Sequence, residues 1–363
     1  MLKRSTLTKT LLLTSLLLPL AGQGQALPPL EVSAPAGDVL RPGHLGRQTG
    51  DIEQIVHFYY DLLGTGLRGE RDEPRPFWTS PGLIEFANTP QQADFRAVIL
   101  HLPGTTAEAG GVEMTVEAIE FRNMERHQYV QNLDDIGGSH LVLLVRNLDS
   151  AVSKLKEEGV RIVTEGEEPV AVPLMYGDNR TKRAIIVRDP DGYPVELVEL
   201  TPTPATTAPA DSNLIGARIS VTVEDLAAST KLYEDLVGSD MKFWTSPDFV
   251  KDEAYNTLRA TPNAEYRYAS ALIPGSPVYL EFVQYRGVEQ RNIDPILQDI
   301  GTAHALFMVD DMDVMMPRLA AAGMSTLSPT GGPVFIGPTT HALFSKELNN
   351  FFIEFMASTA AAE

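Results

Sequence analysis

The sequence predicts an α+β fold with two tandem domains, each formed by a pair of similar modules. Three observations support this prediction. The pentapeptide FWTSP occurs at 77–81 and again at 243–247. A segment rich in Pro, Thr and Ala, 201–212, divides the rest of the chain into two halves. In each half an apolar strand followed by a capped helix occurs twice, and modules should pair because a lone sheet with one helix leaves a face uncovered.

Four helices are predicted by an Asp or Asn at the start and a Gly at the end. These start and end residues are Asp51 and Gly64, Asn147 and Gly159, Asp225 and Gly238, and Asp311 and Gly323. The first side chain accepts from free backbone N–H groups, and Gly adopts the left-handed conformation that ends a helix. The separations are 13, 12, 13 and 12 residues, so the first module matches the third and the second matches the fourth. Pro317, inside the fourth helix, is expected to kink it.

Each helix is followed by two or three strand-like runs, such as 95–102, 114–121, 183–189 and 194–200. The predicted module is therefore a strand, a helix and about three further strands. FWTSP is interpreted as a trace of duplication at the end of a strand and the turn after it. Its tryptophans, Trp78 and Trp244, are interpreted as packing residues.

The predicted organisation is a signal peptide at 1–26, an N-terminal segment at 27–40, a first domain at 41–200, a linker at 201–212 and a second domain at 213–358. Lys3, Arg4 and Lys9 precede the short apolar run 11–22, and Ala26 is a small residue at the candidate cleavage site. This arrangement is typical of secretory signal peptides, and the run is short for a membrane span. We therefore expect an exported protein, periplasmic or secreted.

Composition excludes several classes of function. The formal net charge is −19, and the chain has no cysteine. An acidic protein repels nucleic acid and anionic lipid, so neither is expected as a partner. Disulfides and thiol catalysis are excluded, so stability must come from packing or a bound metal. A small-molecule substrate is the expected partner. One chain holds enough modules for a monomer, and a homodimer stays open.

Histidines recur at equivalent positions of the four modules. Seven residues before each helix start, the strands carry His44, His140, Arg218 and His304. The chain has 7 histidines, so three of them at four equivalent positions indicate a shared role.

Glutamates recur in the last strand of each module, as Glu196, Glu281 and Glu354. In the first module Glu117 and Glu120 compete, and their opposite parity in a strand means that only one faces inward. Glu281 and Glu117 each precede a DIG sequence by 18 residues, which selects Glu117.

If neighbouring modules pair, the first domain gathers one set of four side chains: His44, Glu117, His140 and Glu196. Two imidazoles and two carboxylates are costly to bury unless a cation neutralises them. This mixed set suits one divalent ion of Zn, Ni, Co, Mn or Fe.

The second domain would gather Arg218, Glu281, His304 and Glu354. Arg218 supplies a fixed positive charge that can pair with both carboxylates, so no metal is expected there. His341 is a weak candidate to replace the missing ligand.

The chain resembles the vicinal oxygen chelate superfamily, which includes glyoxalase I, extradiol dioxygenases, epimerases and antibiotic-resistance proteins. The resemblance is carried by GHLGRQTGDIEQIVHFYYDLLG (43–64), GSHLVLLVRNLD (138–149) and RDPDGYPVELVEL (188–200), and it covers the chain after residue 40 in two copies. It implies paired βαβββ modules in a U-shaped mixed sheet with helices outside and a metal on the concave face. It also implies that His44, Glu117, His140 and Glu196 occupy the ligand positions of glyoxalase I, whereas Arg218 departs from the family pattern.

The resemblance implies a metal-dependent lyase or isomerase acting on a small oxygen-rich molecule through an enediolate. Glu117 or Glu196 would be the catalytic base, and the residues do not choose between them. An extradiol-type dioxygenase using His44, His140 and Glu196 is the alternative, although a fourth ligand argues against it. An exported, non-catalytic small-molecule-binding protein is a third possibility. Candidates to bind an anionic substrate are Arg96, Tyr176 and Arg183.

Overall fold

The computed structural model describes residues 39–174, 180–238 and 241–358, which form four modules. The predicted signal peptide, most of the N-terminal segment and Tyr176 lie outside the described residues. Within the described ranges, no helix combines the length and the apolar character needed to cross a membrane.

Each module begins with a strand and a helix and continues with further strands. The first contains β1 (Val39–Gln48), α1 (Ile52–Val56), the π-helix η1 (His57–Leu62), β2 (Gly66–Leu67), α2 (Pro81–Phe86), β3 (Asp94–His101) and β4 (Thr115–Arg122). The second contains β5 (Ser139–Val145), α3 (Leu148–Glu157), β6 (Val170–Val172), β7 (Thr181–Arg188) and β8 (Pro194–Thr201). The third contains β9 (Leu214–Thr222), α4 (Leu226–Val237), β10 (Trp244–Thr245), α5 (Glu253–Arg259), β11 (Glu265–Leu272) and β12 (Tyr279–Arg286). The fourth contains β13 (Ala303–Val309), α6 (Met312–Ala321), β14 (Ser325–Thr326), β15 (Val334–Phe335), β16 (Thr340–Lys346) and β17 (Phe352–Ser358).

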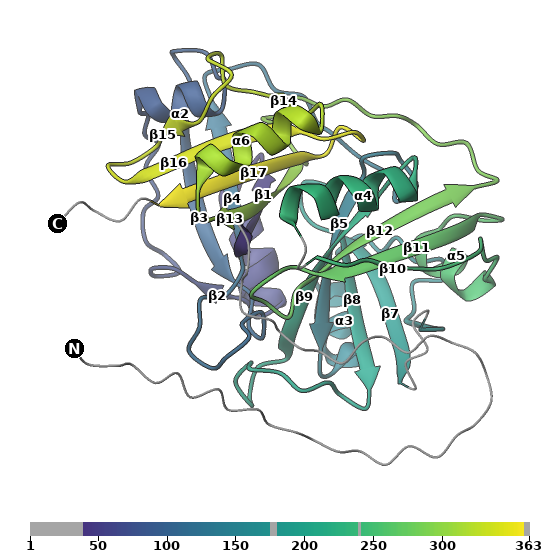
Figure 1. Ribbon diagram of the computed structural model, residues 1–363. Helices are drawn as coiled ribbons and strands as arrows, with labels where there is room; N and C mark the ends of the chain where they lie inside the picture. Colours follow the sequence, from purple (N-terminus) through teal and green to yellow (C-terminus); the bar gives the residue numbers. More distant parts are fainter. Residues whose placement is uncertain (1–38, 175–179, 239–240, 359–363) are drawn as a thin grey trace, which may run out of the picture.

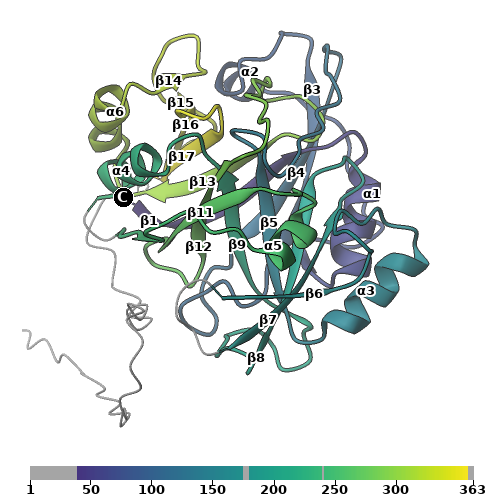
Figure 2. The same cartoon turned by 90° about the vertical axis from the view of Figure 1, so that its right-hand side faces the viewer.

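The strands form two mixed sheets, and each sheet joins one module from each half of the chain. The first sheet has the order β14-β16-β17-β13-β1-β4-β3-β2, with β15 paired to β16, and so combines the first and fourth modules. The second sheet has the order β10-β11-β12-β9-β5-β8-β7-β6 and combines the second and third modules. Figures 1 and 2 show the purple strand β1 and the yellow strand β17 in the same sheet, where β13 lies between them. The α+β fold of paired modules in mixed sheets is confirmed.

The predicted pairing of neighbouring modules is wrong. β1 pairs antiparallel with β13, and β5 pairs antiparallel with β9, so segments 41–200 and 213–358 each contribute strands to both sheets. The linker therefore connects β8 to β9 inside one sheet. Its Thr206 donates to the carbonyl of Ile215, and its Thr207 donates to the carbonyl of Thr106. A Pro- and Thr-rich segment can be a fixed connection as well as a boundary between domains, and composition alone does not distinguish the two.

The predicted helix starts are confirmed. Asp51, Asn147, Asp225 and Asp311 each accept a backbone N–H of the first turn through their side chains. Pro317 lies inside α6 without ending it. The first predicted helix is α-helical only to Val56 and continues as the π-helix η1.

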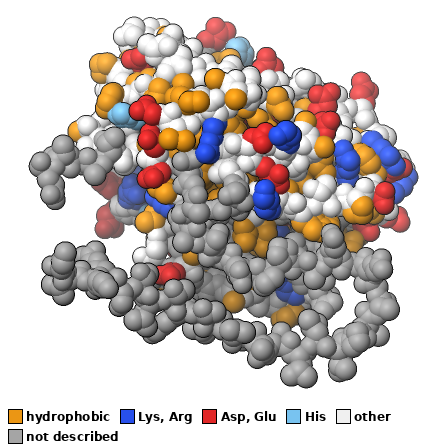
Figure 3. All heavy atoms as spheres, viewed as in Figure 1, with side chains coloured by type: hydrophobic (Ala, Val, Ile, Leu, Met, Phe, Trp, Pro, Cys, Tyr) orange, Lys and Arg blue, Asp and Glu red, His pale blue; other side chains and the backbone are white. Residues whose placement is uncertain are grey.

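A single continuous apolar core contains residues of all four modules. α1 packs on β3 and β4, α3 on β8, α4 on β11 and β12, and α6 on β17 and α4. The face seen in Figure 3 carries acidic and basic side chains interspersed with apolar ones.

The RDPDGYPVEL segment connects the two sheets. Asp189, at the turn between β7 and β8, accepts from Arg47 of β1 at 2.8 Å and from the Tyr59 hydroxyl at 3.2 Å. Arg47 is fully buried. Asp191 accepts from the backbone N–H of Gly50 at 2.9 Å. The motif that carries the family resemblance most specifically thus holds the first module against the second.

Each FWTSP copy begins a segment that folds over a concave sheet face. Trp78 forms a β-bridge with Phe95, and Trp244 begins β10. The helices that follow are α2, which contacts β15 and β16 of the fourth module, and α5, which contacts β6 and β7 of the second module. The duplicated pentapeptide therefore precedes a helix that covers the partner module of its own sheet.

Candidate metal centre

Four adjacent strands of the first sheet carry the side chains of a candidate metal centre. His44 lies on β1, Glu117 on β4, His304 on β13 and Glu354 on β17. Gly46 of β1 is the register partner of both Glu117 and His304. Since residues directly opposite each other across strands share one face of a sheet, these side chains project from the same concave face.

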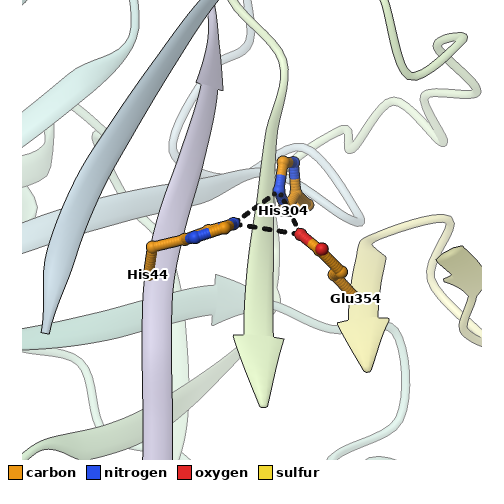
Figure 4. A group of neighbouring side chains, drawn as sticks. All are labelled: His44, His304 and Glu354. Carbon is orange, nitrogen blue, oxygen red and sulfur yellow. Dashed lines mark hydrogen bonds and ion pairs between the residues drawn. The ribbon is translucent and has the colours of Figure 1, made fainter. Parts of the chain in front are cut away.

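Three of these side chains form a tight cluster. Nε2 of His44 lies 3.0 Å from Oε2 of Glu354 and 3.2 Å from Nε2 of His304, and the latter two atoms are 3.1 Å apart. Figure 4 shows the three side chains pointing toward one another from their strands. His44 is 7% exposed, His304 1% and Glu354 3%. Two imidazoles and one carboxylate that converge in a buried place form a donor set that fits a divalent cation.

Glu117 lies beside this cluster, on the other nitrogen of His44. Its Oε2 is 3.2 Å from Nδ1 of His44, and its side chain is 24% exposed. On the opposite side, the Gln48 amide nitrogen is 3.5 Å from Nδ1 of His304. An acceptor at the second ring nitrogen fixes the orientation and tautomer of a ligating histidine, and the Glu117 carboxylate can be one for His44, whereas the Gln48 nitrogen is a donor. In this arrangement Glu117 orients His44 and lies closer to solvent than the cluster does.

The three clustered groups shift one another's pKa values. Burial lowers the pKa of His44, but the negative charges of Glu117 and Glu354 outweigh burial and raise it above its ordinary value. Burial dominates at His304 and lowers its pKa. Burial raises the pKa of Glu354, yet the charges and hydrogen bonds of His44 and His304 outweigh burial and lower it to about 2. The carboxylate is therefore ionised and ready to bind a cation at neutral pH.

Gly46 makes room for one of the imidazoles. A Cβ at this position would lie 1.8 Å from Cε1 and 2.1 Å from Nε2 of His304. The backbone φ of Gly46 lies outside the left-handed region, so the chain conformation does not require glycine here. The space that glycine leaves is occupied by the His304 ring.

The second sheet carries the equivalent residues in a different chemical setting. Nζ of Lys182 lies 2.7 Å from Oε1 of Glu196, and Nε2 of His140 lies 3.2 Å from Oε2. Arg259 of α5 is 3.9 Å from the same carboxylate. Burial raises the pKa of Glu196, but Lys182, His140 and Arg259 outweigh it and hold the pKa below its usual range. We call the concave face that carries His44 and Glu354 the first cup, and the one that carries His140 and Glu196 the second cup. Fixed positive groups of the second cup lie where a cation would have to bind, so this cup does not suit a metal.

Arg218 pairs with Glu281 at 2.7 Å, as expected. The other expected partner, Glu354, lies in the first sheet and pairs with histidines. The expected Arg218–Glu281 ion pair is therefore present, whereas the predicted set of residues around it is wrong.

The predicted set of four is divided between the two cups. His44 and Glu117 lie in the first sheet, whereas His140 and Glu196 lie in the second. His304 and Glu354, assigned to the degenerate site, complete the first cup instead. Each of these residues lies on the strand that was predicted for it. The assignment to the cups was wrong because the modules pair differently from the prediction.

Of the candidate substrate-binding residues, the two that the structure describes, Arg96 and Arg183, do not line either cluster. Arg96 pairs with Glu120 at 2.6 Å, and Glu120 also accepts from the first turn of α1, on the face of the sheet away from Glu117. Arg183 pairs with exposed Asp149 at 2.7 Å. His341 packs against the exposed Phe335 ring. Among the described residues it belongs to no group that could bind a metal.

Three contributors to the cups are absent from the sequence-based prediction: Gly46, Lys182 and Arg259. Lys182 could have been found by parity, because it lies four residues before Ile186, the strand partner of Glu196. Arg259 lies on α5, which the pattern of caps does not predict. Nothing in the sequence distinguishes Gly46 from other strand glycines.

Residues 41–197 match the sequence model of the family described as the Glyoxalase/Bleomycin resistance protein/Dioxygenase superfamily. The match covers 157 of the 363 residues, so segment 41–197 belongs to this superfamily. Together with the two sheets, the match confirms the resemblance predicted from the sequence.

Two curated relatives are similar to the chain. A chloroplastic protein of Arabidopsis thaliana named "Probable lactoylglutathione lyase" is 25% identical over 283 residues, which are 76% of this chain and 61% of that protein. A protein of the same name from Synechocystis is 25% identical over 158 residues, which are 43% of this chain and 92% of that protein.

The fold is similar to that of glyoxalase I from Zea mays, with a TM-score of 0.53 at 16% identity. The similarity covers 87% of this chain and 92% of that chain.

Proposed function

We propose that the cup of the first sheet binds one divalent metal ion and acts as a glyoxalase-like lyase or isomerase on a small oxygen-rich molecule. The observation that carries this proposal is the convergence of His44, His304 and Glu354 on a common point. When bound there, a divalent cation supplies a Lewis acid that polarises a carbonyl oxygen. The names of the two curated relatives support the lyase class.

Glu117 is the proposed proton acceptor. Its carboxylate lies next to the cluster and is the more exposed of the two carboxylates in this cup. The carboxylate can accept a proton from the carbon beside a polarised carbonyl and return it to the neighbouring carbon. Glu196, the other candidate base, lies in the second sheet and is already engaged by Lys182 and His140.

Solvent deuterium exchange into dihydroxyacetone, a simple hydroxycarbonyl, tests this assignment. The metal-loaded protein should catalyse the exchange, and Glu117→Gln should reduce the rate by about a hundredfold or more, because general base catalysis contributes at least that much. Glu120→Gln is the matched control, since Glu120 is three residues away on the same strand and faces the opposite side. Equal rates for wild type and Glu117→Gln would show that Glu117 is not the base.

The reaction class of the relatives is tested directly by S-lactoylglutathione formation from methylglyoxal and glutathione. The predicted export disfavours a glutathione adduct, because that thiol pool is cytosolic. We therefore expect hydroxycarbonyl exchange to exceed S-lactoylglutathione formation, and the opposite order would reassign the substrate.

A second candidate function is extradiol-type ring cleavage of a catechol. One observation favours it: the tight cluster contains two histidines and one carboxylate, with Glu117 on the far nitrogen of His44. Such a triad with open positions is typical of Fe(II) oxygenases. Oxygen consumption with catechol by the iron-loaded protein would select this function, and its absence would remove it. Absence of bound metal altogether would favour a non-catalytic binding protein.

A further inference from the structure

The cup of the second sheet encloses a cavity of about 40 Å³ with charged walls. Among the described residues, three positive and two negative side chains line it: Lys182, Arg218, Arg259, Glu196 and Glu281. The positive groups exceed the negative groups by one. In a chain with a formal net charge of −19, this buried cavity reverses the charge of the molecule as a whole.

Arg259 has unused donors that lie within this cup. It ends α5 and is 3% exposed. Its Nη1 lies 3.5 Å from His140 and 3.9 Å from Glu196, and the Tyr255 and Tyr285 rings lie 5.2 and 5.7 Å from its guanidinium carbon. Nε and Nη2 make no well-directed hydrogen bond in the described part of the chain, and the Tyr285 hydroxyl is a weak neighbouring acceptor. A buried guanidinium with unused N–H groups favours an acceptor supplied from outside.

The histidine of this cup does not add to the positive charge. Burial and the neighbouring Arg259 lower the pKa of His140, so its ring is neutral at neutral pH. The described side chains that line the cavity therefore carry one more positive charge than negative charges.

A mainly apolar cavity adjoins the charged one. It measures about 90 Å³, and it shares Leu174, Leu200 and Arg218 with the first cavity. The rest of its wall is mainly apolar, with Leu144 and Ile215, and also includes Arg180. Since one water needs about 10–15 Å³ of such space, the charged cavity accommodates a small acid group and the apolar one a short hydrocarbon chain.

We infer that the second cup binds a small organic monoanion, namely a carboxylate with a short apolar tail. The carboxylate oxygens accept from the unused N–H groups of Arg259 and lie near Lys182, while the tail lies along Leu174 and Leu200. One negative charge balances the excess positive charge, and charge-assisted hydrogen bonds to a guanidinium are among the strongest in proteins. The inference concerns the second sheet and does not depend on the metal chemistry proposed for the first.

Calorimetric titration of the full chain with butyrate and with butyramide, its neutral isostere, tests the inference. We expect butyrate to bind at least about tenfold more tightly than butyramide, because the amide loses the charge-assisted bonds. Equal affinities, or no binding of butyrate, would overturn the inference. Tighter binding of inorganic phosphate than of butyrate would overturn the assignment to an apolar monoanion.

Two variants locate the site. Arg259→Lys keeps the charge and removes the guanidinium donors, and Lys182→Met removes the ammonium group; each should weaken butyrate binding about tenfold. Arg183→Gln is the matched control, since Arg183 neighbours Lys182 on β7, pairs with exposed Asp149 and should leave affinity unchanged. The Lys182 side chain is 18% exposed, so Lys182→Met remains informative if Arg259→Lys does not fold. Wild-type affinity in Lys182→Met would refute the location.

Discussion

Replacing Gly46 with alanine adds one methyl group and tests the geometry of the metal centre. The new Cβ would lie 1.8 Å from Cε1 of His304, whereas carbon atoms in contact are about 3.5–4.0 Å apart. The ring must therefore move by about 2 Å. Nε2 of His304 now lies 3.1 Å from Oε2 of Glu354, and zinc–nitrogen bonds need about 2.0–2.1 Å, so a displaced ring cannot share a metal with that carboxylate.

We expect Gly46→Ala to weaken metal binding by about a hundredfold or more, because changes that only misorient a ligand already cost about 10–100-fold. The expected loss of stability is about 1–3 kcal/mol, the usual cost of overpacking. Competition with a chromophoric chelator measures the affinity, and urea unfolding measures the stability.

Gly332→Ala is the matched control, since its Cβ would meet no heavy atom within 4 Å. Adding His304→Ala to Gly46→Ala should restore stability by removing the clashing ring, without restoring metal affinity. Wild-type affinity in Gly46→Ala would refute the assignment of His304 as a ligand.

Four further predictions follow from the same structure. Asp189→Asn should lower the free energy of unfolding by about 3–5 kcal/mol in urea, because it leaves buried Arg47 without its ionic partner; exposed Asp149→Asn should cost less than about 1 kcal/mol. Metal affinity should rise as the pH increases above 6.5, because the pKa of His44 is raised and its proton must leave before a cation binds; a pH-independent affinity would contradict this. Removing metal with a chelator should lower the melting temperature, and adding metal back should restore it. Intact-mass measurement of protein exported by a bacterial host should give a chain that starts near Leu27, and a retained leader would refute the predicted cleavage.

The repeated module could be predicted because its signals are local. Caps such as Asp51 and Asn147 act within one helical turn, and alternation along a strand fixes which face Glu117 and Glu354 share. The pairing of modules could not be predicted in the same way. β1, β5, β9 and β13 begin equivalent modules, and the repeat carries no information about which first strand pairs with which.

This ambiguity explains the outcome for the site. All eight aligned side chains lie on the predicted strands, yet their division between two cups depended on the pairing. Two of the three positive groups of the second cup were missed for another reason. Lys182 and Arg259 have no counterparts in the repeat pattern, and Arg259 reaches Glu196 only because α5 folds over the second sheet.

Metal content of purified variants is the most direct test of the central claim that the first and fourth modules together bind the cation. Wild type and His140→Ala should retain about one divalent ion per chain after dialysis, whereas His304→Ala should lose it, because a mixed His and carboxylate site needs its third donor. If His140→Ala loses the metal and His304→Ala keeps it, the ion is bound by residues of neighbouring modules and the account is wrong.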